Sequence, residues 1–408
     1  MKKGWQTKTI GDVCEFQRGL TYAKGDEVDV SDNVVLRATN IHLATNLLIF
    51  DELKYISDKV VVPESKKVKQ GSLMICMASG SKSHLGKVAF IDDDYGYAFG
   101  GFMGMLTPRN GLLPKYLFHL MTSEDYKDFI GALSDGANIN NLTFDKLKVF
   151  PVPVPPLAEQ QRIVCLLDEA FEGLATAKAN AEKNLQNARA LFESHLQSVF
   201  TQRGKSVRAG WHKTKLAELA DVQSGAGFPT KFQGKVKGGI PFYKVSDMNL
   251  EGNERNMVHE NNSITEEVRK KLGASLFPQG SVIFPKIGGA IATNKKRLTT
   301  RDCCVDNNVM GAIPKPGRMS SEFLYYFFLA YNLSDFANEA HLPSIKKTVV
   351  ENWELCVPKT IPEQERIVEQ LDSFTEETQR LARLYEQKLA ALEALKKSLL
   401  HQAFTGQL

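Results

Sequence analysis

Residues 157–164 read LAEQQRIV and residues 361–368 read IPEQERIV, and this repeated stretch decides the fold. The two copies also end alike, because Phe404-Thr405 matches Phe200-Thr201 at the same offset. A constant offset means that neither copy contains an insertion, as expected of a helix that must keep one face. The sequence therefore predicts two long helices, at residues 157–204 and 361–408.

Apolar residues in both copies recur in steps of three and four, which is the period of one helical face. Neither Gly nor Pro occurs between Glu363 and Thr405, so one helix of about 60 Å is expected at 1.5 Å per residue. The first seam is rich in Ala, whereas the second is rich in Leu and Tyr and includes Leu395. Small side chains facing large ones favour a close helix pair. Its expected contacts include Ile163, Leu167, Leu174, Leu371, Leu381 and Leu392.

Gly173 interrupts the first helix, where glycine costs about 1 kcal/mol relative to alanine. We therefore expect a close contact or a slight bend at this position. The alternative to helix pairing is that each helix packs only on its own globular segment.

Length and composition are those of a soluble globular protein with two or more domains. The chain has 408 residues, of which 43% are hydrophobic and 24% charged. We see no apolar run long enough to span a membrane and no signal peptide, and we expect no membrane partner. The six scattered cysteines indicate reduced thiols in a cytoplasm. Acidic residues outnumber basic ones in the repeated stretches, so the basic excess behind the net charge of +4 lies on the other two segments. This excess permits a nucleic-acid partner.

Residues 1–156 and 205–360 are two divergent copies of one globular fold. Trp5 precedes Gly19 by the same interval by which Trp211 precedes Gly225. Each copy continues with a Gly-Ser pair before a short strand, a glycine-rich polar loop, an aromatic helix and a final strand with prolines. The aromatic helices are expected at about residues 114–133 and 320–340. Two copies that differ mainly in their loops are suited to two different specificities.

The order of the segments predicts their arrangement. If the second helix pairs with the first, it runs back toward the first domain, and the pair is antiparallel. We therefore expect an α+β protein in which two homologous globular domains are separated by a long antiparallel two-helix coiled coil with approximate two-fold symmetry. A spacer of this length would reach DNA half-sites between one and two helical turns apart.

The two helix starts, each closing a variable domain, and the terminal FTGQL (residues 404–408) resemble the specificity (S) subunit of type I restriction-modification systems. The resemblance covers the entire chain. It implies two target recognition domains, residues 1–156 and 205–360, each reading one half of a bipartite site in double-stranded DNA. It also implies that the helices set the spacing and bind two methyltransferase (M) subunits, and that restriction (R) subunits join for cleavage. A bacterial or archaeal cytoplasm is the expected location.

The same resemblance implies a chain without a catalytic centre or cofactor, with S-adenosylmethionine bound by the M subunits. The residues agree, since no Asn-Pro-Pro-Tyr run of an amino-methyltransferase is present. Residues 80–87 imitate a phosphate-binding loop but have five residues between the glycines, and Val88 stands where Ser or Thr is needed. We expect no metal site. Two alternatives stay open: an enzyme with its own active site, and a coiled-coil adaptor that binds only protein.

Candidate DNA contacts are basic, hydroxyl and amide side chains in the predicted loops, because Lys and Arg neutralise phosphates while Asn, Ser, Arg and His read base edges. They are Arg18, Lys24, Arg37, Lys82, Ser83, His84, Lys87, Asn140, Lys231, Lys235, Lys244, Lys286, Asn294, Lys295, Lys296, Arg297 and Lys346. Polar residues of the repeated helix starts are the candidate partner contacts, namely Glu159, Gln160, Arg162, Glu363, Gln364 and Arg366.

Overall fold

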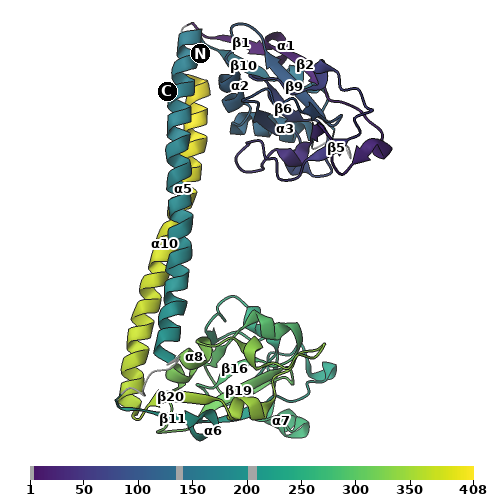
Figure 1. Cartoon of the computed structure of the whole chain (residues 1–408). Coiled ribbons are helices and arrows are strands. Elements are labelled where there is room, and N and C mark those ends of the chain that lie inside the picture. The colour runs from purple at the N-terminus through teal and green to yellow at the C-terminus, as the bar shows by residue number, and fades with distance from the viewer. Residues whose placement is uncertain (1–3, 135–140, 201–208) are drawn as a thin grey trace. The chain divides into compact units, whose positions relative to one another are not determined.

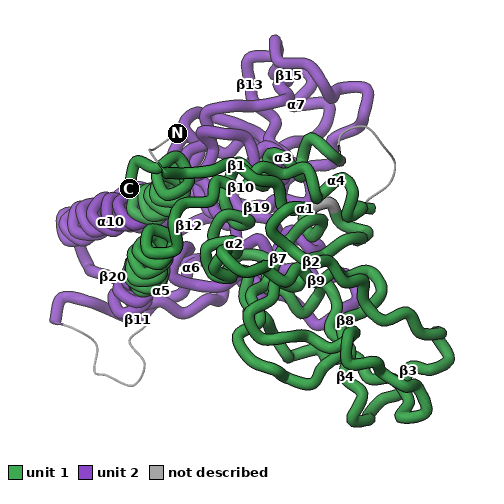
Figure 2. The backbone as a smooth tube through the Cα atoms, turned by 90° about the horizontal axis from the view of Figure 1, so that it is seen from above, with its two compact units in different colours: residues 1–182, 386–408 green, residues 183–385 purple. Residues whose placement is uncertain are grey.

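Two compact units make up the chain, and the computed structural model describes residues 4–134, 141–200 and 209–408 of it. Unit 1 comprises Met1–Glu182 and Glu386–Leu408, and unit 2 comprises Lys183–Tyr385 (Figure 2). Each unit contains one globular domain, called domain 1 or domain 2 below, together with parts of both long helices. The predicted boundary at residues 204 and 205 lies outside the described residues.

The two long helices are α5 (Leu157–Phe200) and α10 (Ile361–Thr405). The prediction of one unbroken second helix is confirmed, and residues 201–204 of the first lie outside the described part. In unit 1 the start of α5 packs on the end of α10, because Ile163 and Leu167 share one apolar cluster with Leu400 and Phe404. The two helices therefore run antiparallel in this unit, as predicted (Figure 1).

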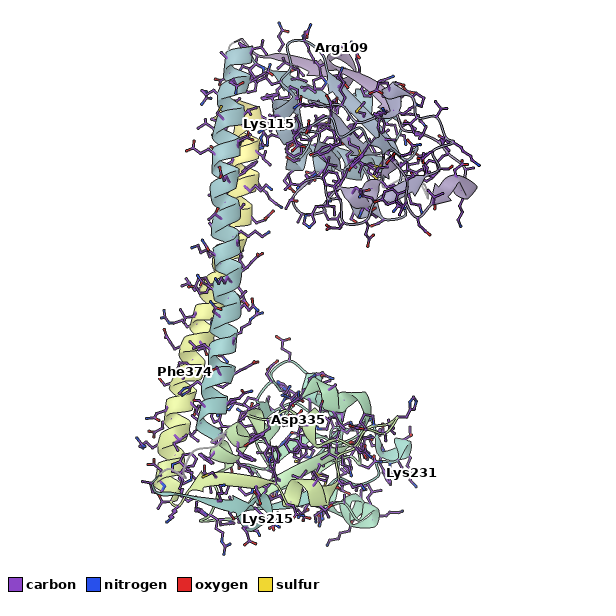
Figure 3. All side chains as sticks on the ribbon, in the orientation of Figure 1. Arg109, Lys115, Lys215, Lys231, Asp335 and Phe374 are labelled. Atoms are coloured by element: carbon purple, nitrogen blue, oxygen red, sulfur yellow. The ribbon has the colours of Figure 1, made fainter. Side chains whose placement is uncertain are left out.

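Unit 2 repeats this pairing with the other halves of the helices. Leu196 and Phe200 of α5 lie in one cluster with Ile367 and Leu371 of α10. The ring of His195 lies 4.7 Å from that of Phe374, which Figure 3 labels on α10. The helices also contact the domains, because both clusters extend into the domain cores.

The predicted seam is confirmed along most of its length. Ile163, Leu167 and Leu371 are 1% exposed, and Leu174, Leu381 and Leu392 are half-buried. The prediction for Leu395 is wrong, because this side chain is 48% exposed and the buried residues of the last turns are Leu400, Ala403 and Phe404. Residues spaced in steps of three and four repeat about every 3.5 residues, whereas one helical turn takes 3.6 residues. A line of residues with this spacing therefore drifts around the helix and leaves the buried face.

The expectation of a close contact at Gly173 is also wrong. A Cβ atom built at this position meets no atom within 4 Å. The glycine therefore lies on an open face of α5.

Domain 1 is built from two four-stranded sheets and a two-stranded ribbon. The ribbon joins β1 (Gln6–Thr9) to β10 (Pro151–Val154). One sheet has the order β2 (Cys14–Arg18), β9 (Met103–Pro108), β6 (Leu73–Cys76), β7 (Val88–Phe90). The other has the order β3 (Glu27–Val28), β5 (Lys54–Ile56), β4 (Asn33–Leu36), β8 (Ala98–Phe99). Its helices are α1 (Ile10–Val13), α2 (Pro114–Leu120), α3 (Glu124–Ser134) and α4 (Phe144–Lys148).

Domain 2 repeats this plan with sheets of five and three strands. Its ribbon joins β11 (Trp211–Lys215) to β20 (Glu354–Pro358). The larger sheet has the order β12 (Ala220–Ser224), β19 (Val309–Pro314), β16 (Val282–Pro285), β17 (Arg297–Thr299), β14 (Asn256–Met257). The smaller has the order β15 (Ser263–Ile264), β13 (Ile240–Tyr243), β18 (Cys304–Val305). Its helices are α6 (Leu216–Leu219), α7 (Glu266–Leu272), α8 (Ser321–Leu329) and α9 (Lys347–Glu351).

Strand pairing shows that the domains share one fold. In domain 1, β4 pairs with β8 in parallel, with Leu36 opposite Phe99. In domain 2, β13 pairs with β18 in the same way, with Tyr243 opposite Val305. The predicted α+β fold with two homologous domains is confirmed.

The predicted aromatic helices are shorter than expected. In domain 1 the stretch breaks into α2 and α3 at Ser123, whose hydroxyl accepts a hydrogen bond from Tyr126 N and so starts a new helix. In domain 2, α8 ends at Leu329, and Asn332 begins a separate short turn by accepting a bond from Ser334 N. Both breaks are made by side chains that cap a following turn.

A buried glutamine fixes the start of each long helix to its domain. Gln160 accepts a hydrogen bond from Leu113 N (2.8 Å) and donates to Gly111 O (2.9 Å). Gln364 accepts from Ser320 N (2.8 Å) and donates to Arg318 O (2.9 Å).

Both side chains are 0% exposed, so the predicted partner contacts at Gln160 and Gln364 are wrong. Their side-chain amides are already hydrogen-bonded to backbone groups of the chain itself. We call these two sets of bonds the glutamine latches.

Among the described residues, no helix combines the length and the apolar character that crossing a bilayer requires.

Candidate nucleic-acid interface

Four turns of domain 1 meet at one end of its sheets, and they form the domain 1 loop cluster (residues 18–24, 37–39, 77–78 and 100–102). Backbone bonds join the turns: Gly19 N donates to Met103 O (3.1 Å) and Leu20 N donates to Phe99 O (2.7 Å). The cluster is therefore a built part of the domain and not a set of independent loops.

The domain 2 loop cluster (residues 224–233, 244–246, 286–287 and 306–308) uses the same bonds. Gly225 N donates to Val309 O (3.0 Å) and Ala226 N donates to Val305 O (3.0 Å). The two clusters are equivalent parts of the two copies, with different side chains on one backbone plan.

Glycine is required at the crossing of these turns. A Cβ atom on Gly19 would lie 1.9 Å from the carbonyl oxygen of Gly100, and one on Gly225 would lie 2.0 Å from that of Asp306. Both distances are far below van der Waals contact, so the glycines of the predicted matching turns have a packing role.

The domain 1 loop cluster surrounds a pocket of about 460 Å³. Lys24, Arg37 and Gly100 line it together with Phe102, whose side chain is 74% exposed. Glu27 also lines the pocket, and its carboxylate forms an ion pair with Lys54. The pocket thus combines cationic groups with an exposed aromatic ring.

The domain 2 loop cluster is polar, and its side chains bond to one another. Lys244 Nζ donates to Gln233 Oε1 (3.0 Å), and Lys286 Nζ donates to Ser224 Oγ (3.0 Å). Asp306 is 5% exposed and accepts bonds from both the backbone and the side-chain amide of Asn308. Burial raises the pKa of Asp306, while the bonds from Asn308 favour its ionised form.

The predicted basic loop at residues 79–87 is only partly open to solvent. Ser83 is exposed, whereas His84 and Lys87 are half-buried. Lys87 Nζ donates to Ile41 O (3.3 Å), and burial lowers the pKa of Lys87 to about 8. Burial also lowers the pKa of His84. The side chain of Lys82 lies outside the described part.

Three predicted DNA contacts in domain 2 instead form hydrogen bonds within the domain. Lys296 is 1% exposed, and its ammonium donates to Asn294 Oδ1 (2.6 Å) and to Tyr331 O (2.8 Å). Burial lowers the pKa of Lys296 to about 7. Arg297 lies in β17 and donates to Lys296 O and Met248 O. A buried ammonium cannot reach a phosphate, so the prediction for Lys296 is wrong, and Asn294 and Arg297 serve the same internal network.

Most of the remaining candidates of the predicted set have accessible side chains. Lys295 is half-buried and donates to Asn249. Figure 3 places Lys231 on the side of domain 2 that faces away from the helices of unit 2. Asn140 lies outside the described residues. The exposed candidates are Arg18, Lys24, Lys231, Lys235 and Lys346, and their DNA contacts stay predictions.

The polar residues at the two helix starts form matching ion pairs. Arg162 Nε donates to Glu159 Oε2 (2.7 Å), and Arg366 Nε donates to Glu363 Oε2 (3.0 Å). The hydrogen bond from Arg366 lowers the pKa of Glu363. Arg162 also donates to Leu408 O (2.8 Å). Arg162 and Arg366 are exposed, so both remain candidate partner contacts.

Sequence reasoning missed a charged clamp between each domain and the helices. In unit 1, Asp168 of α5 lies 2.6 Å from Lys115 Nζ and 2.7 Å from His119 Nε2 of α2. Lys115 lies on the side of domain 1 that faces α5 (Figure 3). In unit 2, Arg255 Nη1 donates to Asp372 of α10 (2.8 Å). The two aspartates occupy equivalent positions of the repeat. This repetition is the signal by which the sequence could have identified them.

The described residues contain no group of three or more His, Cys, Asp and Glu side chains placed to hold a metal ion.

Comparison with protein families matches the chain to the type I restriction modification DNA specificity domain, over residues 2–185 and again over residues 208–393. The chain is 28% identical to the type I restriction enzyme StySPI specificity subunit of Salmonella potsdam, over 100% of this chain and 90% of that protein.

Two solved structures support the fold. One is a chain from work on complex assembly and conformational transition of the type I R-M system, with a TM-score of 0.82 at 18% identity over 100% of this chain and 99% of that chain. The other is the HsdS subunit from Thermoanaerobacter tengcongensis, with a TM-score of 0.66 at 20% identity over 100% of this chain and 98% of that chain.

Proposed function

Because the chain belongs to the type I restriction-modification DNA specificity family, we propose that it is the subunit that selects the DNA sequence in such a complex. Each globular domain reads one half of a bipartite site in double-stranded DNA. The subunit is non-catalytic, and S-adenosylmethionine is bound by the methyltransferase subunits that it recruits. The complex works in the cytoplasm of a bacterium or archaeon.

The observation that carries this proposal is the pair of equivalent loop clusters. Both rest on the same backbone bonds, at Gly19 in one domain and Gly225 in the other, while their side chains differ. Base edges are told apart by the donors and acceptors presented to them. One scaffold with two sets of donors and acceptors is therefore suited to reading two different half-sites.

The long helices recruit the partners. Leu191 is 50% exposed and Leu395 is 48% exposed, and these leucines occupy equivalent positions of the repeated helices. A single exposed leucine is common on a protein surface, so the support for the proposal is that the exposure repeats at equivalent positions of both helices. Two equivalent positions support two M subunits per chain, to which R subunits add for cleavage.

Methylome sequencing tests the proposal. A restriction-free host would express this chain with its cognate M subunit, and a second host the M subunit alone. We expect methylated adenines at a two-part motif with a fixed gap only when this chain is present. If a purified complex of this chain and M produces no new methylation, the proposal fails and a protein-binding adaptor takes its place.

Native mass spectrometry of the same complex measures the stoichiometry. Two M subunits per chain are expected, and one M subunit per chain would contradict the equivalent binding positions.

A further inference from the structure

Arg37, in the domain 1 loop cluster, has no side-chain hydrogen bond or ion pair among the residues that the structure describes. Arg37 follows β4 and lines the pocket of about 460 Å³. Its Nε atom is buried and has no hydrogen-bond acceptor. Among residues 4–134, 141–200 and 209–408, no carboxylate forms an ion pair with its guanidinium either. Arg37 as a whole is half-buried and lines the pocket, so its guanidinium is available to a ligand or to water there.

Two acceptors of this region are already in use. Glu27 lines the same pocket but is paired with Lys54. Asn40 Oδ1 accepts from the backbone amide of Arg37 (2.8 Å) and not from its side chain. The charge of Arg37 is therefore not needed to hold domain 1 together.

The equivalent residue of domain 2 behaves differently. Lys244 has the same backbone bond, from its amide to Asp247 Oδ2 (2.7 Å), but its ammonium donates to Gln233 (3.0 Å). At this position of the shared fold, the unbonded guanidinium therefore occurs in domain 1 and has no counterpart in domain 2, although the buried Nε of Arg297 in β17 also lacks an acceptor.

The surroundings of Arg37 select the kind of ligand. Gly100 and Gly101 have no side chains to close the pocket, and the exposed Phe102 lies at its edge. A phosphate is strongly hydrated and gains little beside an aromatic ring, whereas a base presents acceptors and an apolar face together. Guanine offers O6 and N7, two acceptors that match the two-pronged guanidinium.

Resting on the proposed function, we propose that Arg37 reads a guanine in the half-site bound by domain 1, while Phe102 contacts the neighbouring base pair. Lys24 lies exposed at the same pocket and contacts the phosphate backbone. Domain 2 has no equivalent guanine contact at Lys244. The structure thus assigns a required guanine at this position to one half-site only.

Arg37→Ala and Arg37→Met in the complex with M test this assignment, and Met keeps most of the aliphatic stem. We expect methylome sequencing to show that the guanine requirement is lost at one position of one half-site, with the other half unchanged. Binding to the cognate duplex, measured by fluorescence anisotropy, should weaken about 5- to 150-fold, as for loss of one bidentate base contact. Thermal melting of both variants should match that of the wild type.

A modified duplex isolates the contact. Replacing the required guanine by 7-deazaguanine removes the N7 acceptor, so wild-type binding should weaken while binding by Arg37→Ala should not change further. Lys24→Ala is the matched control, which should weaken binding to every sequence alike and reduce the salt slope by about 1.

Two results would overturn the assignment while leaving the proposed function intact. One is a bipartite motif that Arg37→Ala retains with wild-type affinity. The other is a uniform loss across all sequences with a reduced salt slope, which would make Arg37 a phosphate contact. If the wild-type complex methylates no bipartite motif, the proposed function itself fails.

Discussion

Gly173 and Gly225 show that a glycine in this chain has one of two opposite roles. Gly173 lies within α5 with open space where a side chain would be, whereas Gly225 lies against the carbonyl oxygen of Asp306. Gly173 loses more backbone entropy on folding than another residue would, and no packing contact requires it. Gly225 permits two turns to cross.

We predict that Gly173→Ala stabilises the protein by about 0.5–1 kcal/mol, because alanine restricts the unfolded chain and meets no atom in the folded one. Urea unfolding of the full chain, for the variant and the wild type, measures this. Gly225→Ala is the opposing control and should destabilise domain 2 by about 1–3 kcal/mol through overlap. Lower stability of Gly173→Ala would mean that α5 needs a bend there.

Asp168 makes stability depend on pH at the acid end. The bonds from His119 and then Lys115 lower the pKa of Asp168 to about 2, below its ordinary value of 3.8. A depressed folded pKa means that this stabilisation is present above pH 3.8 and is lost as the pH falls toward 2. The carboxylate is more than a third exposed, so solvent screening keeps the effect small.

We therefore expect Asp168→Asn to lower the free energy of unfolding at pH 6 by about 1 kcal/mol. Near pH 2 the variant and the wild type should unfold alike, as followed by circular dichroism in urea. If the variant loses the same unfolding free energy at both pH values, Asp168 acts through packing and not through its charge.

At the scale of elements, burial separates the side chains of the helix pair into a packed seam and an exposed face. Leu381 of α10 is half-buried on the seam, while Leu384, one turn later, is 52% exposed. The two leucines differ only in the face that they occupy.

Leu381→Asp should destabilise unit 2 by about 2 kcal/mol or more, because the seam leaves a carboxylate without a partner. Leu384→Asp is the matched control and should change the unfolding free energy by less than about 0.5 kcal/mol. Both are measured by chemical denaturation of the full chain. Equal effects of the two substitutions would contradict the observed helix pairing.

The period of the helices and the duplication of the domains could be predicted from the sequence, because both depend on the order of residue types. The burial of Lys296 and Gln160 could not be predicted, because each side chain is held by a backbone group that is distant in the sequence. Lys296 binds Tyr331 O, and Gln160 binds Gly111 O. A polar residue looks the same in a sequence whether water or a carbonyl group satisfies it. For the same reason Arg37 could be named a candidate, but its missing partner could be seen only in the fold.

At the scale of the whole molecule, α5 and α10 each pass through both units as continuous helices. In the proposed function their length sets the gap between the half-sites. Seven residues extend a helix by about 10 Å and return nearly the same face.

A seven-residue helical insertion in both helices, after Glu182 and after Tyr385, should therefore abolish methylation of the wild-type motif. Any motif that is still methylated should have a gap longer by about three base pairs, at 3.4 Å per base pair. Methylome sequencing measures the gap of the methylated motif directly. The control is an insertion in α5 alone, which should disrupt the pairing of the two helices. Methylation with an unchanged gap would show that the helices do not set the distance.

The glutamine latches have a consequence for inheritance. Gln160 and Gln364 make the same bonds to a backbone amide and a backbone carbonyl, whatever side chains the domains carry. A foreign domain with those two backbone groups in place would fit either joint. Exchange of one gene segment between related strains can thus produce a new target sequence in a single event, while the helices and all that they bind stay unaltered.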